Sequence, residues 1–181
     1  MKTFIDGSIF GDAFLGNRLA LLVDLIVDQG DTLLKDAGLS FPSRATSTIL
    51  LVSKRENLST ADIADELDQP HQLATQRVDS LVKLGLLERR NDPMDARRKT
   101  LSLTKKGEKE ATILEETLRD AQLAFQGLYQ ELGVNLGSIA TDAILALKQT
   151  PITSRIENGA NRVNSDIPSQ NREREGKQSN A

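Results

Sequence analysis

The feature that most constrains the fold is a pair of short segments, Leu86–Asn91 and Thr100–Thr104, in which the residues alternate as in β-strands. The loop that joins them begins with an Asp-Pro turn and ends in arginine and lysine residues. Every other periodic segment that we identify repeats as a helix does. The sequence therefore predicts one β-hairpin, with a long basic loop, in a mostly α (α+β) protein.

Four helices are predicted before the hairpin, and residues that favour helix ends separate them. Proline opens the second and fourth helices, Ser59 can cap the third, and Gly38 and Gly85 can end the first and the fourth. We expect these helices over about 12–36, from Pro42 to the polar break at 54–57, over 60–67 and over 70–84. The third and fourth helices are separated only by the turn at 68–70, so they form a helix-turn-helix directly before the hairpin.

The first helix is too apolar to be covered on one side alone. Its main apolar stripe contains Leu15, Leu19 and Leu22, and further apolar residues lie off that stripe at positions 21, 23, 25 and 27. Contacts on more than one side are typical of a helix at a subunit interface.

Two more helices are predicted after the hairpin. The first runs from Thr104 to about Leu132 with a heptad seam, and the second begins at the cap Asn135 and ends near 149. Together with the first helix, they carry more apolar surface than a small domain covers alone, so we expect a homodimer. The residues expected in the dimer interface are Leu15, Leu19, Leu22, Leu114, Leu118, Phe125, Leu128 and Leu147.

The end of the chain differs in composition from the rest. Residues 150–181 are rich in Ser, Asn, Arg and Glu, and their isolated apolar residues cannot build a core. We expect a disordered tail there and a single domain over residues 1–149.

Composition excludes several classes of protein. The 181 residues contain no cysteine and a single histidine, His71, so thiol chemistry is excluded and no cofactor or metal is implied. We find no glycine-rich phosphate loop and no nucleophile elbow, and therefore expect no enzyme. The longest apolar run, Leu19–Val27, is shorter than the roughly 20 residues of a membrane helix, and the start lacks the pattern of a signal peptide. We expect a cytoplasmic protein without membrane contact.

The charge of the chain is unevenly distributed. The net charge is −3, but residues 86–106 contain seven basic and three acidic side chains, a net of +4. A local basic patch on an acidic protein indicates a binding surface for a polyanion such as nucleic acid.

Short motifs in residues 63–107 resemble those of the MarR family of multiple-antibiotic-resistance-type regulators. The wing motif Asp-x-Arg, followed by Leu-Thr-x-x-Gly, is the most discriminating, since a generic helix-turn-helix has neither. The residues that carry the resemblance are Ile63-Ala64, Leu67, Val78-Asp79, Leu81, Gly85-Leu86, Glu88-Arg89-Arg90, Asp92-Pro93, Asp95-x-Arg97-Arg98 and Leu103-Thr104-x-x-Gly107. More weakly, the resemblance extends over residues 12–149.

The resemblance implies a winged helix-turn-helix with flanking N- and C-terminal dimerisation helices. The DNA-reading core would span 58–107, and the dimerisation helices 12–36 and 104–149. The implied function is a sequence-specific double-stranded DNA-binding transcriptional regulator, expected to be a repressor, that acts as a homodimer on a pseudo-palindromic operator. Family members commonly respond to a small aromatic or phenolic effector, for which this sequence shows no sharp pocket motif. Four residues depart from the family pattern, at Gln69, Pro70, Arg77 and Ala96.

The outward face of the fourth helix carries the candidate base-reading residues. Gln72, Thr75 and Gln76 are polar and uncharged, and a glutamine can make a bidentate contact to adenine in the major groove. Lys83 is expected to contact a phosphate, and Asp79 to orient Arg77 or Lys83 rather than to touch DNA. The alternative is an ordinary solvated helix face.

The hairpin loop carries the second set of candidates. Arg97 is expected to enter the minor groove, where narrow A·T tracts concentrate negative potential. By resemblance, Asp95 would hold that arginine in place, and Arg98 and Lys99 would contact phosphates. The alternatives are that these charges only solubilise the hairpin, or that the winged fold serves as a protein-interaction module without DNA binding.

Overall fold

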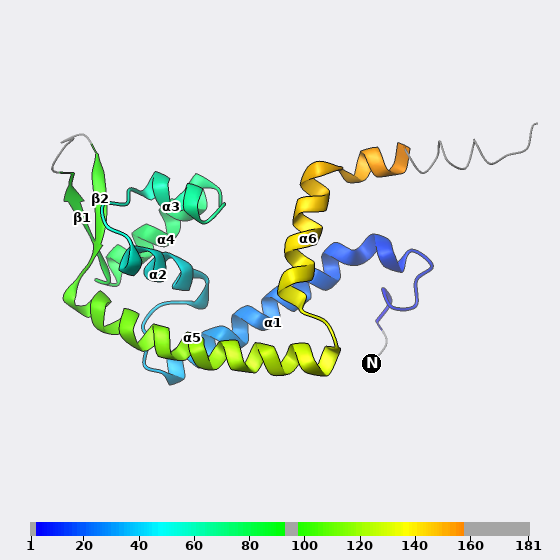
Figure 1. The fold of residues 1–181 in the computed structure, drawn as a ribbon, viewed down its shortest axis with the longest axis horizontal. Helices are drawn as coiled ribbons and strands as arrows, with labels where there is room; N and C mark the ends of the chain where they lie inside the picture. Colours follow the sequence, from blue (N-terminus) through cyan, green and yellow to red (C-terminus); the bar gives the residue numbers. More distant parts are fainter. Residues whose placement is uncertain (1–2, 93–97, 158–181) are drawn as a thin grey trace, which may run out of the picture. The chain divides into compact units, whose positions relative to one another are not determined.

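A computed structural model describes residues 3–92 and 98–157 of the chain, and within them it contains each helix and strand predicted above. The mostly helical winged helix-turn-helix fold is confirmed (Figure 1). The chain divides into two compact units, residues 1–123 and 124–181. The helices are α1 (Leu15–Asp36), α2 (Thr46–Lys54), α3 (Thr60–Glu66), α4 (His71–Lys83), α5 (Lys105–Leu132) and α6 (Leu136–Gln149), with 3-10 turns at Gly11–Phe14 and Ser43–Ala45.

The hairpin consists of β1 (Leu87–Asn91) and β2 (Lys99–Leu103), which pair antiparallel from Leu87 opposite Leu103 to Asn91 opposite Lys99. A further backbone contact joins β2 to the segment before α3, because the Leu101 N–H donates to the Leu58 carbonyl at 2.8 Å. The sequence patterns did not predict this bridge. It fixes the hairpin, which we call the wing, to the start of the helix-turn-helix.

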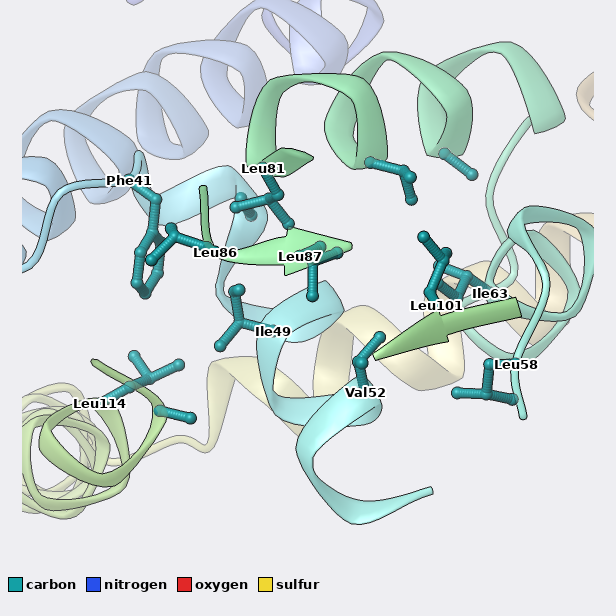
Figure 2. Packing of buried hydrophobic residues seen from close by; sticks show 14 of the residues in the cluster. Phe41, Ile49, Val52, Leu58, Ile63, Leu81, Leu86, Leu87, Leu101 and Leu114 are labelled. Atoms are coloured by element: carbon teal, nitrogen blue, oxygen red, sulfur yellow. The ribbon is translucent and has the colours of Figure 1, made fainter. Parts of the chain in front are cut away.

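The core of the first unit lies between the helix-turn-helix, α2, the wing and the start of α5 (Figure 2). Ala74, Val78 and Leu81, which the helical period of the sequence placed on the inner face of α4, are fully buried. Other members of the core include Phe41, Ile49, Ile63, Leu86, Leu87, Leu101 and Leu114. The inner face of α4 is therefore fixed by packing, and its outer face is left to solvent.

The Leu-Thr-x-x-Gly motif forms the joint between the end of α4 and the start of α5. The Thr104 hydroxyl donates to the Gly85 carbonyl at 2.6 Å and accepts the Gly107 N–H at 3.1 Å. A Cβ on Gly107 would lie 2.1 Å from the Leu86 carbonyl oxygen, which is closer than real Cβ atoms approach. Only glycine fits at this helix position, and this explains the motif in steric terms.

The end of α1 and the loop after it are tied to the winged body by two carboxylates. The Ser43 N–H donates to Asp31 at 2.6 Å, and this backbone hydrogen bond, with the Ser43 hydroxyl, lowers the pKa of the Asp31 carboxyl. Buried Glu110 of α5 accepts hydrogen bonds from the N–H of Ser40 at 2.9 Å and from its hydroxyl. The C-terminal part of α1 is thus an integral part of the first unit.

The apolar residues expected in a dimer interface differ in exposure within the single chain. Leu114 is fully buried in the core of its own chain, so it has no surface for a partner, and the heptad seam was wrong as an interface at this position. Leu118 is half-buried against the same core. On α1, Leu22 is half-buried, whereas Leu15 and Leu19 are 56% and 50% exposed.

The second unit holds the end of α5 and the helix α6. The ring centroids of Phe125 and Tyr129 lie 6.4 Å apart, and Leu128 is half-buried, whereas Leu147 on α6 is exposed. Asn135 caps α6 as expected, because its side-chain oxygen accepts the N–H of Ser138 at 3.0 Å.

Residues 152–157 are helical, although their composition predicted a disordered tail. Their start is favoured by Pro151, and the guanidinium of Arg155 donates to the carbonyls of Ala146 and Thr150 at the end of α6. The rest of the expected tail, residues 158–181, lies outside the described residues. None of the described helices is long and apolar enough to cross a membrane.

Candidate nucleic-acid interface

The outer face of α4 presents the side chains that the sequence singled out. Gln72, Thr75, Gln76 and Lys83 are all exposed, whereas the inner face of the same helix is buried. The Thr75 hydroxyl donates to the His71 carbonyl at 2.9 Å, so it offers acceptor lone pairs to an outside ligand. This face can donate and accept hydrogen bonds without presenting a row of like charges.

Asp79 on the same face pairs with the wing and not with the residues expected from the sequence. Its carboxylate accepts from the guanidinium of Arg89 in β1, rather than from Arg77 or Lys83. The pairing compensates the one acidic charge of the outer face of α4 and adds a side-chain link between α4 and the wing.

Four of the predicted DNA contacts belong to the loop of the wing or its end. Asp95 and Arg97 lie outside the described residues. Lys99 is exposed, and its ammonium group donates to the side-chain oxygen of Asn91 across the hairpin. Arg98 is engaged within the protein, because Nη1 donates to Asp92 at 2.7 Å and Nη2 donates to Asp62 at 2.5 Å.

The first turn of α3 closes as a capping box. The Asp62 N–H donates to the Ser59 hydroxyl at 3.2 Å, and the Asp62 carboxylate accepts the Ser59 N–H at 2.7 Å. The hydrogen bonds from Ser59, followed by Arg98, hold the pKa of the Asp62 carboxyl below its ordinary value. The sequence predicted the cap, but not the additional ion pair with Arg98.

The turn between α3 and α4 brings together two of the residues that depart from the family pattern. The Arg77 Nη1 group donates to the Gln69 side-chain oxygen. The Arg77 Nε and Gln69 Nε2 groups are buried without a hydrogen-bond partner. Burial, followed by the nearby Arg44, lowers the pKa of Arg77. Arg77 and Gln69 therefore satisfy each other's hydrogen-bonding groups only in part.

The described residues hold no group of three or more His, Cys, Asp or Glu side chains that could bind a metal ion. The arrangement instead combines an exposed polar helix face, an adjacent wing and basic side chains from both. Such a surface can contact base edges through α4 and the sugar-phosphate backbone through the wing.

Comparison with known proteins gives a match to a family profile and matches to solved structures. The profile of the MarR family matches residues 37–98, which contain α2, α3, α4 and β1. No curated protein sequence matches significantly. Among solved structures, the transcription regulator MarR from Oenococcus oeni PSU-1 is similar, with 26% identity, 72% of this chain and 98% of that chain covered, and a TM-score of 0.54.

Two further solved structures show the same fold at lower identity. The transcriptional repressor CouR, bound to a 23-mer DNA duplex, has 20% identity and a TM-score of 0.56, with 78% of this chain and 94% of that chain covered. The PcaV transcriptional regulator from Streptomyces coelicolor, in complex with its natural ligand, has 17% identity and a TM-score of 0.58, with 82% of this chain and 97% of that chain covered.

Proposed function

The chain belongs to the MarR family of winged helix-turn-helix DNA-binding transcription regulators, and from this premise we propose that it acts as a homodimeric repressor on a pseudo-palindromic DNA site. The observation that carries the proposal is the two-sided α4, whose inner face is fully buried and whose outer face presents exposed Gln72, Thr75 and Gln76. The family is non-enzymatic. We propose that the protein acts in the cytoplasm, where it would meet its DNA site.

In this proposal, α4 lies in the major groove and reads base edges. Gln72 and Gln76 are one helical turn apart, so both can face the groove floor, and glutamine pairs well with the N6 and N7 groups of adenine. Thr75 supplies an acceptor or a methyl contact beside them. Lys83, near the end of the helix, contacts a phosphate.

The wing supplies the second contact in the proposal. Arg97 enters the minor groove and Asp95 orients it, as the sequence motif implies. Lys99 contacts a phosphate from the adjacent strand β2. Arg98 lies between Arg97 and Lys99 in the sequence, but its guanidinium is already held by two carboxylates of its own chain.

Dimerisation is supported by the apolar residues that each unit leaves exposed. On α1, Leu15, Leu19 and the off-stripe residues Leu21 and Leu25 are each about half exposed or more. In the second unit, Leu147 is exposed, along with Ile139, Ile144 and Leu145 on the same helix, and Phe125 and Leu128 add half-buried surface. Apolar surface of this extent on a monomer is typical of a protein-protein interface. A second copy of the chain would bury the same surface on both protomers.

Repression and release by an effector are the finer parts of the proposal. The named relatives support them, because one is a repressor solved on a DNA duplex and another was solved with its natural ligand. We propose a small aromatic or phenolic molecule as the effector of this chain.

The proposal is tested by selecting duplexes from a randomised 30-base-pair pool with the full chain and measuring its mass by light scattering. We expect a dimer and a selected pseudo-palindrome whose half-site centres lie about one helical turn, 10 to 10.5 base pairs, apart. A chain that selects no sequence, but still forms a dimer, would be a protein-interaction module instead. A monomer that binds single half-sites equally well would refute the dimeric mode.

A further inference from the structure

The guanidinium of Arg98 lies at the junction of the wing and α3. Nη1 donates to Asp92 Oδ2 at 2.7 Å, and Nη2 donates to Asp62 Oδ2 at 2.5 Å. The side chain of Asp92 is only 9% exposed, so the pair is sheltered on the side of the wing. We call Arg98, Asp62 and Asp92 the wing clamp. Hydrogen bonds between charged groups are among the stronger ones that proteins form.

One end of the wing clamp closes the base of the hairpin loop. Besides the ion pair, the Asp92 N–H donates to the Arg98 carbonyl at 3.0 Å, so these two residues are joined by both backbone and side chain. Asp92 follows β1 directly, and Arg98 directly precedes β2. The contacts of Arg98 therefore fix the positions at which β1 ends and β2 begins.

The other end of the wing clamp is fixed to the first turn of the helix-turn-helix. Asp62 Oδ2 accepts the N–H of Ser59 at 2.7 Å, the Ser59 hydroxyl at 2.8 Å and the Arg98 guanidinium. A carboxylate with three donors stays ionised, in line with its lowered pKa. Together with the Leu101–Leu58 backbone bond, this contact attaches the wing at two separate places, to α3 and to the segment directly before it.

The charges of the wing clamp argue against a phosphate contact for Arg98. One arginine is matched by two aspartates, so a phosphate brought to Arg98 would also approach two negative charges. We propose that Arg98 is a positioning residue, which sets the angle between the wing and the helix-turn-helix so that both can contact one duplex. This inference rests on the proposed function. It implies that Asp62, although acidic, favours DNA binding.

Whether substitution of Asp62 weakens or strengthens DNA binding separates a positioning role of Arg98 from a direct phosphate contact. The probe is a duplex that the wild-type chain selects from a randomised pool, and the measurement is its Kd at several salt concentrations. We expect Arg98→Ala and Asp62→Asn each to weaken binding about five- to tenfold, the double variant to be no worse than either, and the salt slope to stay unchanged. The preference for A·T flanks should fall in all three variants, because the wing is displaced.

Two control variants isolate the ion pair. Asp65→Asn removes the same charge from the same helix at an exposed position, and we expect it to leave binding unchanged or slightly stronger. Ser59→Ala weakens the capping box but leaves the Asp62–Arg98 pair, and we expect less than about a twofold change in Kd. Circular dichroism at the assay temperature establishes that every variant is folded.

The opposite pattern would overturn the proposal. If Arg98→Ala lowers the salt slope by about one unit while Asp62→Asn strengthens binding, Arg98 contacts a phosphate. If the wild-type chain selects no duplex, the proposed function fails, but the clamp is still tested by hydrogen exchange of the Asp92 amide. Faster exchange in Arg98→Ala than in wild type supports the clamp, and equal exchange refutes it.

Discussion

The Arg77–Gln69 pair at the turn of the helix-turn-helix tests how much buried donors without partners lower the stability of the fold. Arg77 and Gln69 share one hydrogen bond, but Arg77 Nε and Gln69 Nε2 remain buried without partners. The double substitution Gln69→Leu and Arg77→Met removes these groups and keeps side chains of similar length. We expect the double variant to be more stable than the wild-type chain.

The magnitude follows from the groups that are removed. Each buried donor without a partner costs about 1 to 3 kcal/mol, and a hydrogen bond that involves a charged group contributes about 1.5 to 3 kcal/mol. Removal of two orphaned donors and one such bond leaves a gain of about 2 kcal/mol from central values. Either single substitution removes one orphaned donor but strands the group that had been paired. We therefore expect both single variants to remain near the wild-type stability.

Urea unfolding of the DNA-free protein, at one fixed protein concentration because a dimer is expected, measures these differences. The double variant should unfold at a higher urea concentration than the wild type and than both single variants, with an unchanged m-value. A double variant that is less stable than wild type would show that the pair is a net stabilising contact and that its buried donors are satisfied in solution.

The remaining predictions concern the Gly107 joint, the proposed DNA contacts of α4 and the wing, and acid stability. Gly107→Ala should lower stability by about 1 to 3 kcal/mol or more, because the new Cβ meets the Leu86 carbonyl. The control Gly127→Ala, in the same helix with nothing within 4 Å of the new Cβ, should raise stability by about 0.5 to 1 kcal/mol. Equal shifts of the melting temperature in the two variants would contradict the steric explanation. Gln76→Ala should weaken binding to the selected duplex by about 1 to 3 kcal/mol and leave non-specific binding nearly unchanged in anisotropy titrations. Arg97→Ala should weaken binding to most sequences and make the slope of log affinity against log salt concentration shallower by about one unit, and Asp95→Ala should reproduce part of this defect. An unaltered slope in a folded, dimeric Arg97→Ala variant would show that the wing does not contact DNA. The Asp31 carboxyl binds protons less readily in the folded chain, so its stabilisation is complete above the unfolded pKa of about 3.9 and is lost as the pH falls through the lower folded pKa. Asp31→Asn should flatten this part of the acid-unfolding curve. A curve identical to that of the wild type would argue against the Ser43 hydrogen bond.

The positions of helices and strands could be predicted from sequence because local chemistry marks their ends. Ser59 closes a capping box, and Gly85 and Gly133 adopt the positive φ that ends a helix, at 71° and 70°. The burial of Val78 and Leu81 followed from helical period alone. These signals need no knowledge of which segments meet in space.

Side-chain partners could not be predicted in the same way, because each depends on two segments that meet only after folding. Asp79 pairs with Arg89 across α4 and β1, and Arg98 reaches Asp62 from 36 residues away. The apolar seam of α5 has a related ambiguity. Its period is the same whether a leucine packs inside its own chain, as Leu114 does, or faces a partner.

The separation of α4 into a buried and an exposed face has a consequence for how such a protein can change. Because Ala74, Val78 and Leu81 hold the helix, the residues at 72, 75 and 76 can be replaced with little effect on the core. New binding preferences can thus arise by drift or be installed by design on the outer face, while the scaffold stays constant. In the proposed function, the outer face of α4 can therefore be exchanged without rebuilding the helix, within the limits that the wing clamp and the Gly107 joint set.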